Sequence, residues 1–208
     1  MIYQSLAITL LRPLFELTLV VKHPQTPGRI VSLLQGLCVL YWIGQNDYSS
    51  AIASTLVYFI VDYIFNFVYC TSNNLPMHIH HWVGGALCYF AVHTQSWERT
   101  DVGGELTRSL ILMETTNVSF HTAFLLYHEY QYAALMVPAL IHFYVVRVLR
   151  LGLFINPFNE EAWGVLFFKS HANAVLLMLC LCLWVMQIAW FLLWSWRLLQ
   201  TCWKAKTD

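Results

Sequence analysis

Six apolar segments, each roughly long enough to cross a bilayer, constrain the fold of this chain most strongly. Only 11% of its 208 residues are charged, whereas water-soluble domains carry about a quarter. The bilayer core offers the backbone no hydrogen-bond partner, so segments of this kind cross it as helices. The sequence therefore predicts an all-α, polytopic membrane bundle. The segments are Ile30 to Gly44, Ala51 to Tyr69, Ile79 to Val92, Leu106 to Tyr127, Ala133 to Ile155 and Ala172 to Trp196.

A further apolar stretch, Ile2 to Val21, precedes these segments. It is interpreted either as a seventh, kinked span or as a helix lying in the membrane interface, and both readings stay open. No small-residue cleavage site follows it, so a removed signal peptide is not expected. The basic, proline-rich segment Lys22 to Arg29 is expected to be a loop. The predicted division is an N-terminal apolar segment and loop at 1–28, a transmembrane domain at 29–199 and a short basic tail at 200–208.

Basic residues flank the six segments and predict the orientation. Lys22 and Arg29 precede the first segment, and Arg197, Lys204 and Lys206 follow the last. Six spans place both basic ends on one side, which the positive-inside rule makes cytosolic. The two terminal lysines also resemble a dilysine signal for retention in the endoplasmic reticulum, a signal read by a receptor. The formal net charge is +0, so no nucleic-acid partner is expected.

Polar side chains recur inside the apolar segments. Burying such groups in a bilayer is costly unless they pair with one another or face a polar cavity. Because they occur in several separate segments, we expect them to build one central polar cavity inside the bundle. They are Asp62, His80, His81, Glu114, Asn117, His121, His142 and Arg147.

Two of the segments carry the acid and the imidazoles expected to do chemistry. Tyr58, Asp62 and Asn66 are four residues apart and share one helix face. A carboxylate is a costly way to join helices, which favours a functional role for Asp62 over a purely structural one. His80 and His81 point about 100° apart on a helix and can both border a cavity. Imidazole serves as a general base near neutral pH or as a nucleophile that accepts an acyl group.

A metal site is not expected, because membrane di-iron enzymes need several separated histidine clusters. The other histidines of this chain are scattered singly.

A polar stripe crosses the fourth segment and an arginine lies in the fifth. Glu114, Asn117 and His121 are three and four residues apart and share one face. Glu114 is expected to orient an imidazole or to hold a substrate amine or hydroxyl. His142 and Arg147 lie on different faces of a helix kinked at Pro138. Arg147 has three open interpretations: reaching lipid headgroups, pairing with Glu114, or binding an acidic group of a lipid or cofactor.

The last segment is apolar all round apart from Gln187. Its tryptophans predict a lipid-facing helix with an interfacial aromatic belt. They are Trp184, Trp190, Trp194 and Trp196.

Five short motifs, taken in order, resemble the TLC-domain family, which includes the ceramide synthases. The resemblance covers about Arg29 to Trp196. The first motif, Arg29 to Ser32, resembles the family's entry motif. The others are Tyr58 to Asp62, the pair His80-His81, the acidic and hydroxyl-rich stretch Glu114 to Phe120, and Val145 to Leu149 around the late arginine.

The resemblance implies an acyl-CoA-dependent lipid acyltransferase of the endoplasmic reticulum membrane, acting on a sphingoid-base-like amine with acyl-CoA as co-substrate. His80 or His81 would be base or acyl acceptor, and Asp62 and Glu114 would orient the imidazole and the amine. The expected substrate-binding residues are Tyr58, Asn66, Asn117, His121 and Arg147.

Two other functions remain open. One is a non-catalytic protein that binds or senses membrane lipids and regulates their composition. The other is a structural subunit, in a homo-oligomer or a larger membrane complex, in which the polar residues only join helices. The chain departs from the family at Gln35, at Asn117 and in lacking the aspartate-rich signature of the ceramide synthases, and the missing signature favours the regulator.

Overall fold

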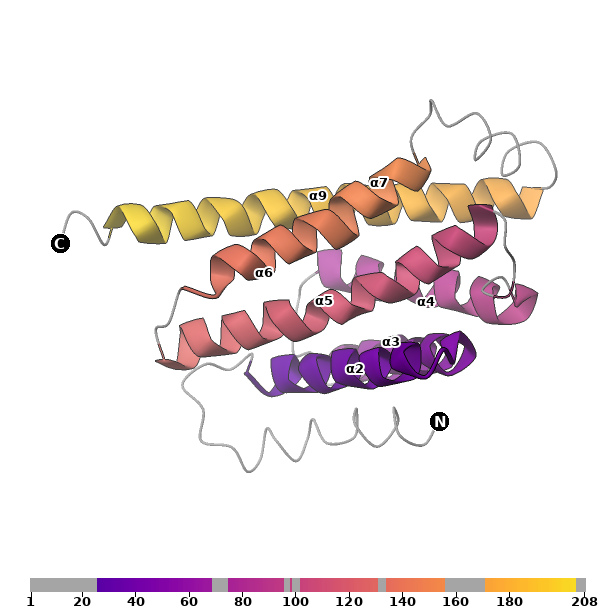
Figure 1. Ribbon diagram of the computed structural model, residues 1–208, viewed down its shortest axis with the longest axis horizontal. Coiled ribbons are helices and arrows are strands. Elements are labelled where there is room, and N and C mark those ends of the chain that lie inside the picture. Colours follow the sequence, from indigo (N-terminus) through magenta and orange to yellow (C-terminus); the bar gives the residue numbers. More distant parts are fainter. Residues whose placement is uncertain are drawn as a thin grey trace.

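The computed structural model describes residues 26–68, 75–95, 98, 102–130, 134–155 and 171–204. All regular secondary structure in these residues is helical, which confirms the all-α prediction. The helices lie roughly along one direction (Figure 1). They are α2 (Thr26–Gly44), α3 (Tyr48–Val68), α4 (Leu75–Thr94), α5 (Val102–Tyr130), α6 (Met136–Phe143), the π-helix η2 (Tyr144–Leu149), α7 (Arg150–Ile155) and α9 (His171–Lys204).

Helices α2, α3 and α4 pack side by side in alternating directions. The Ser32 hydroxyl near the start of α2 lies 2.8 Å from the Tyr58 hydroxyl in the second half of α3. Asp62, one turn further along α3, lies 3.3 Å from His81 in the first half of α4. Neighbouring helices are therefore antiparallel, as short connections between them require.

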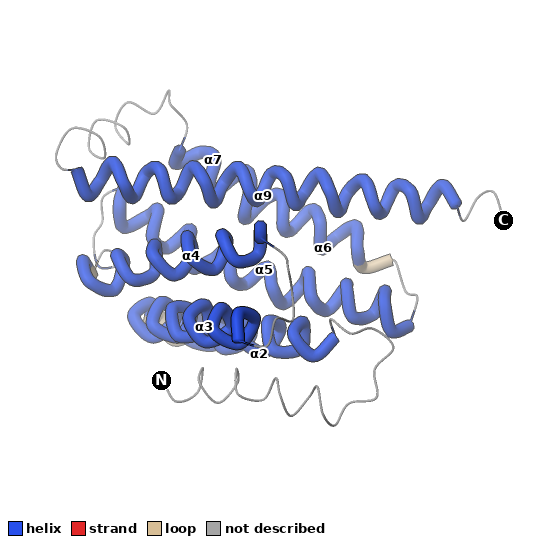
Figure 2. Tube along the Cα trace, turned by 180° about the vertical axis from the view of Figure 1, so that it is seen from behind, coloured by secondary structure: helices blue, strands red, loops and turns tan. Residues whose placement is uncertain are grey.

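The contacts of the remaining helices close the bundle into a ring, and Figure 2 shows α9 running beside α4. Helix α4 packs on α9, α9 on the continuous segment α6–η2–α7, that segment on α5, and α5 on α2. Ser119 of α5 contacts His142 of α6 at 2.8 Å, and Arg29 of α2 contacts His121 of α5 at 3.2 Å. The first turn of α2 and the last turns of α9 therefore lie at the same end of the bundle, hereafter the basic end.

Local sequence explains where two helices begin. Helix α2 begins at Thr26, so the expected loop over Lys22 to Arg29 is wrong at its far end. Pro27 stands in the first turn, where its missing N–H costs no hydrogen bond. Helix α3 follows a tight turn, and Asp47 accepts hydrogen bonds from the backbone N–H of Ser50 and from the hydroxyls of Ser49 and Ser50. These bonds to the charged form lower the pKa of Asp47.

The expected kink at Pro138 is wrong. Pro138 lies in the first turn of α6, where proline is tolerated, and the irregular stretch is the π-helix η2, which carries Arg147.

Two of the described helices are long and apolar enough to cross a membrane, Met136–Ile155 and Leu177–Thr201. A shorter apolar helix covers Tyr48–Ile64. Six or seven spans go beyond this finding and stay a prediction.

Close packing of α2 on α5 depends on Gly36. A Cβ atom added there would lie 3.1 Å from Asn117 Cβ and 3.2 Å from the backbone oxygen of Glu114. Both atoms belong to the middle of α5, so they yield only if the helix shifts. Gly36 thus brings the polar stripe of α5 against α2.

Gly36→Ala is expected to lower the free energy of unfolding by about 1–3 kcal/mol, because overpacking forces the two helices apart. Gly44→Ala is the matched control, since a Cβ at Gly44 meets nothing within 4 Å. Thermal unfolding of the purified, detergent-solubilised variants measures both. Equal melting temperatures for the two variants would contradict the close-packing argument.

Candidate functional site

The ring of helices borders a partly open cavity of about 280 Å³, hereafter the polar cavity. Every helical segment except α7 contributes to its lining. The structure brings together seven residues that the sequence singled out: Tyr58, His80, His81, Glu114, Asn117, His121 and Arg147.

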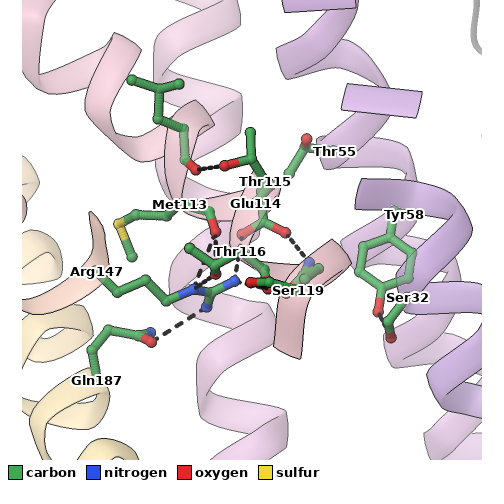
Figure 3. A network of polar contacts seen from close by, with 12 residues as sticks. Ser32, Thr55, Tyr58, Met113, Glu114, Thr115, Thr116, Ser119, Arg147 and Gln187 are labelled. Atoms are coloured by element: carbon green, nitrogen blue, oxygen red, sulfur yellow. Dashed lines mark hydrogen bonds and ion pairs between the residues drawn. The ribbon is translucent and has the colours of Figure 1, made fainter. Parts of the chain in front are cut away.

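Arg147 anchors the inner end of the polar cavity (Figure 3). Its Nε donates to Thr116 Oγ1 at 2.5 Å and to the backbone oxygen of Met113 at 3.1 Å. Its Nη1 donates to Gln187 Oε1 of α9 at 3.3 Å. The side chain is buried, so it does not reach lipid headgroups, and one guanidinium joins η2, α5 and α9.

Glu114 completes this cluster. Its Oε1 lies 3.8 Å from Arg147 Nη2, and its Oε2 accepts a hydrogen bond of 2.8 Å from Asn117 Nδ2. Asn117 Oδ1 in turn accepts from Arg147 Nη2 at 2.7 Å. The expected pairing of Glu114 with Arg147 is therefore confirmed. The contacts recorded for Glu114 are to Arg147 and Asn117, and they give no support to its expected role in orienting an imidazole.

The two histidines occupy different environments. His81 Nδ1 lies 3.3 Å from Asp62 Oδ2, and both side chains are buried. This contact places the His81 ring beside the Asp62 carboxylate. His80 packs against the edges of Phe59 and Trp190, with ring centroids 5.5 and 4.9 Å away. His80 Nδ1 is buried without a hydrogen-bond partner among the described residues.

Two of the singled-out residues, Asp62 and His142, are not among the described residues that line the cavity. Asp62 contacts His81, which does line the cavity, at 3.3 Å. His142 contacts Ser119 at 2.8 Å. The Asn66 side chain lies outside the part of the chain that the structure describes.

Ten further described residues line the polar cavity without having been predicted to, among them Arg29, Trp190, Trp194 and Arg197. The expectation that the last-segment tryptophans form a lipid-facing belt is wrong for Trp190 and Trp194, which line the polar cavity. It is also wrong for Trp184, which donates a hydrogen bond of 2.8 Å to the backbone oxygen of Val148. A helix that is apolar all round carries no periodicity to show which face is covered.

A second, apolar cavity of about 30 Å³ lies beyond the inner end of the polar one. The two cavities share Phe59, His80 and Glu114 in their linings. A Cβ added at Gly84 would lie 2.7 Å from the Phe59 ring, so Gly84 makes room for the side chain between them. Imidazole and carboxylate thus stand at a boundary between polar and apolar space, which suits an amphipathic ligand.

Among the described residues, no group of three or more His, Cys, Asp or Glu side chains is placed to hold a metal ion. Comparison of the chain with protein-family models, curated proteins and solved structures gave no match. The function must therefore be argued from the site itself.

Arg147→Met is expected to lower the free energy of unfolding by about 3–5 kcal/mol, because it leaves the Glu114 carboxylate buried without its cation. Adding Glu114→Gln to that variant should restore much of the loss, since a neutral amide is cheaper to bury. Denaturant unfolding of the single and double variants measures the coupling.

Arg150→Met is the control for this cycle. Arg150 is half-buried and donates to Ser109 at 2.9 Å, outside the cluster. Additive losses in the Arg147 and Glu114 variants would contradict the ion pair.

Proposed function

We propose that the chain is a multi-pass protein of the endoplasmic reticulum membrane that transfers an acyl group from acyl-CoA to a lipid amine of the sphingoid-base class. The observation that carries this proposal is the convergence of His80 and His81 with Glu114, Asn117 and Arg147 on one cavity. The resemblance of the same residues to the TLC-domain motifs supports it.

The surface and the topology support a membrane location. Large apolar side chains point outward from several helices, including Trp82 at 64% and Leu153 at 68% exposure. Such exposure is costly in water and ordinary against lipid. The antiparallel ring places both basic ends together, as six crossings require. The positive-inside rule then turns the polar cavity toward the cytosol, where acyl-CoA is found.

The two histidines take complementary roles in this proposal. His81, oriented by Asp62, takes a proton from the attacking amine. The amine nitrogen forms a bond to the thioester carbonyl, the C–S bond breaks, and the departing thiolate receives the proton. In an alternative route His80, with its buried Nδ1 and aromatic neighbours, is the acyl acceptor: an imidazole nitrogen first displaces the thiolate, and the amine then displaces the imidazole from the acyl group.

The volume of the polar cavity is consistent with these roles. A volume of about 280 Å³ is near the lower bound of about 300 Å³ for small-molecule pockets. It holds the reacting ends of two substrates and leaves their long chains elsewhere.

His80→Ala and His81→Ala are each expected to lower the rate of acyl transfer by about 10²–10⁴-fold while leaving the fold intact, because imidazole supplies the proton transfer or the nucleophile. Asp62→Asn should produce a smaller loss, since it only misorients His81. Product formation from acyl-CoA and a sphingoid base is measured by mass spectrometry, with the melting temperature of each preparation.

His93→Ala is the matched control, because His93 is exposed on the same helix. Undiminished product in the His80 and His81 variants would refute catalysis. A fall in melting temperature that parallels the loss of product would instead favour a structural role.

A non-catalytic lipid-binding regulator is the second candidate. The contacts of Glu114 with Arg147 and Asn117 favour this candidate, because a carboxylate held in this way does not take part in catalysis. Lipid bound by the purified protein without turnover of any acyl-CoA would select this candidate.

A further inference from the structure

The polar cavity is partly open, and its opening lies on one side of α9. Of the described residues that line the cavity, only Leu193 and Arg197 are exposed, and they stand about one turn apart on α9. Residues at this spacing share one helix face, so this face of α9 borders the opening. The proposed chemistry uses neither side chain.

The opposite edge of the opening is the first part of α4. Helix α4 begins at the basic end, where α9 ends, so the two helices are antiparallel (Figure 2). His80 of α4 and Trp190 of α9 contact each other, with ring centroids 4.9 Å apart. Met77 comes nearly one turn before His80 on α4. Leu193 comes nearly one turn after Trp190 on α9, so these two lining side chains stand on opposite sides of the opening.

At Leu193 the opening faces the lipid of the proposed membrane location. The apolar span of α9 is Leu177–Thr201, and about 12 Å of helix rise separates Leu193 from its end at Thr201. The surface beside the opening is apolar on both helices, with Ile79 of α4 43% and Leu192 of α9 60% exposed. An alkyl chain that leaves the cavity here therefore enters the hydrocarbon of the membrane.

Neither cavity can hold a whole lipid. The polar cavity has a volume of about 280 Å³, near the lower bound for pockets that bind drug-sized ligands. The apolar cavity beyond Phe59 has about 30 Å³, which is room for about two water molecules. The long chain of a lipid whose polar end lies at His80 and His81 must therefore leave the bundle.

We propose that the polar cavity opens sideways into the membrane between α4 and α9, and that the alkyl chain of a single-chain lipid passes through this opening over Met77 and Leu193. Both side chains are apolar, and the flexible thioether of Met77 adapts its shape to a chain that slides past it. The inference rests on the proposed function for the class of lipid, an amine with one long chain. The route of the chain requires no acyl transfer.

The length of the chain distinguishes this route from binding of the polar end alone. The full-length protein in nanodiscs of neutral lipid is titrated with a long-chain sphingoid amine and with a short-chain analogue that has the same polar end. Leu193→Trp narrows the opening and is expected to weaken binding of the long-chain amine about tenfold, because two displaced methylenes cost about fourfold each. Binding of the short-chain analogue should not change. Affinities are compared between variants at one chain length, so the partition of the amine into the bilayer cancels.

Leu192→Trp is the matched control, because Leu192 is exposed beside Leu193 but is not among the described residues that line the cavity. It should change the binding of neither amine. Met77→Trp is the second variant, on the α4 edge, and should repeat the loss that depends on chain length. The melting temperature of each preparation shows that the fold is intact.

Photo-crosslinking locates the chain directly. A diazirine in the middle of the long chain should attach to Met77 or Leu193, and an excess of unlabelled amine should suppress this attachment. Attachment to Leu87 or Ile111, which line the apolar cavity, would place the chain inside the bundle and overturn the proposed route.

The outcomes separate the route from the proposed function. A loss in Leu193→Trp that affects only the long-chain amine supports the opening, even when the protein transfers no acyl group. An equal loss for both amines, an equal loss in Leu192→Trp, or no loss at all overturns the opening, even when acyl transfer proceeds.

Discussion

The buried guanidinium of Arg147 is the interaction on which the arrangement of the cavity depends. It reaches the backbone of Met113, the side chains of Thr116 and Asn117, and Gln187 on α9. A buried cation needs this many acceptors because water is excluded around it. Satisfying it fixes the positions of η2, α5 and α9 relative to one another. The same contacts hold Glu114 and Asn117 at the cavity wall, so stability and site geometry have one origin.

The cluster also explains why acids that look alike in the sequence play different parts. Glu114 lies next to Arg147 and is held by Asn117, so its charge balances a cation that the bundle needs. Asp62 lies next to an imidazole that borders the cavity. A carboxylate in contact with a histidine changes the basicity and orientation of the imidazole ring. A carboxylate in contact with an arginine only balances its charge, because the guanidinium stays charged. Of the two acids, Asp62 is therefore the one that contacts an imidazole.

The inner part of the site could be predicted from the sequence because it is made of residues that are rare inside apolar segments. An ionisable residue inside an apolar segment is costly, so Asp62, Glu114 and Arg147 stand out, and helical spacing adds Tyr58 and Asn117. The basic end could not be predicted, for the opposite reason. Arg29 and Arg197 flank apolar segments, where arginine is common and is interpreted as an orientation signal. Trp190 and Trp194 belong to a segment without a polar face, and only tertiary packing decides which of its sides is covered.

Because of the ring topology, the basic end and the inner part of the site follow one another along the bundle. Because consecutive helices are antiparallel, α2 begins where α9 ends, and the arginines of two distant segments meet at Trp194. From there the lining passes to the histidines and the Glu114–Arg147 pair, and then to the apolar space beyond Phe59. Charge, imidazole and hydrocarbon thus follow one another along the bundle.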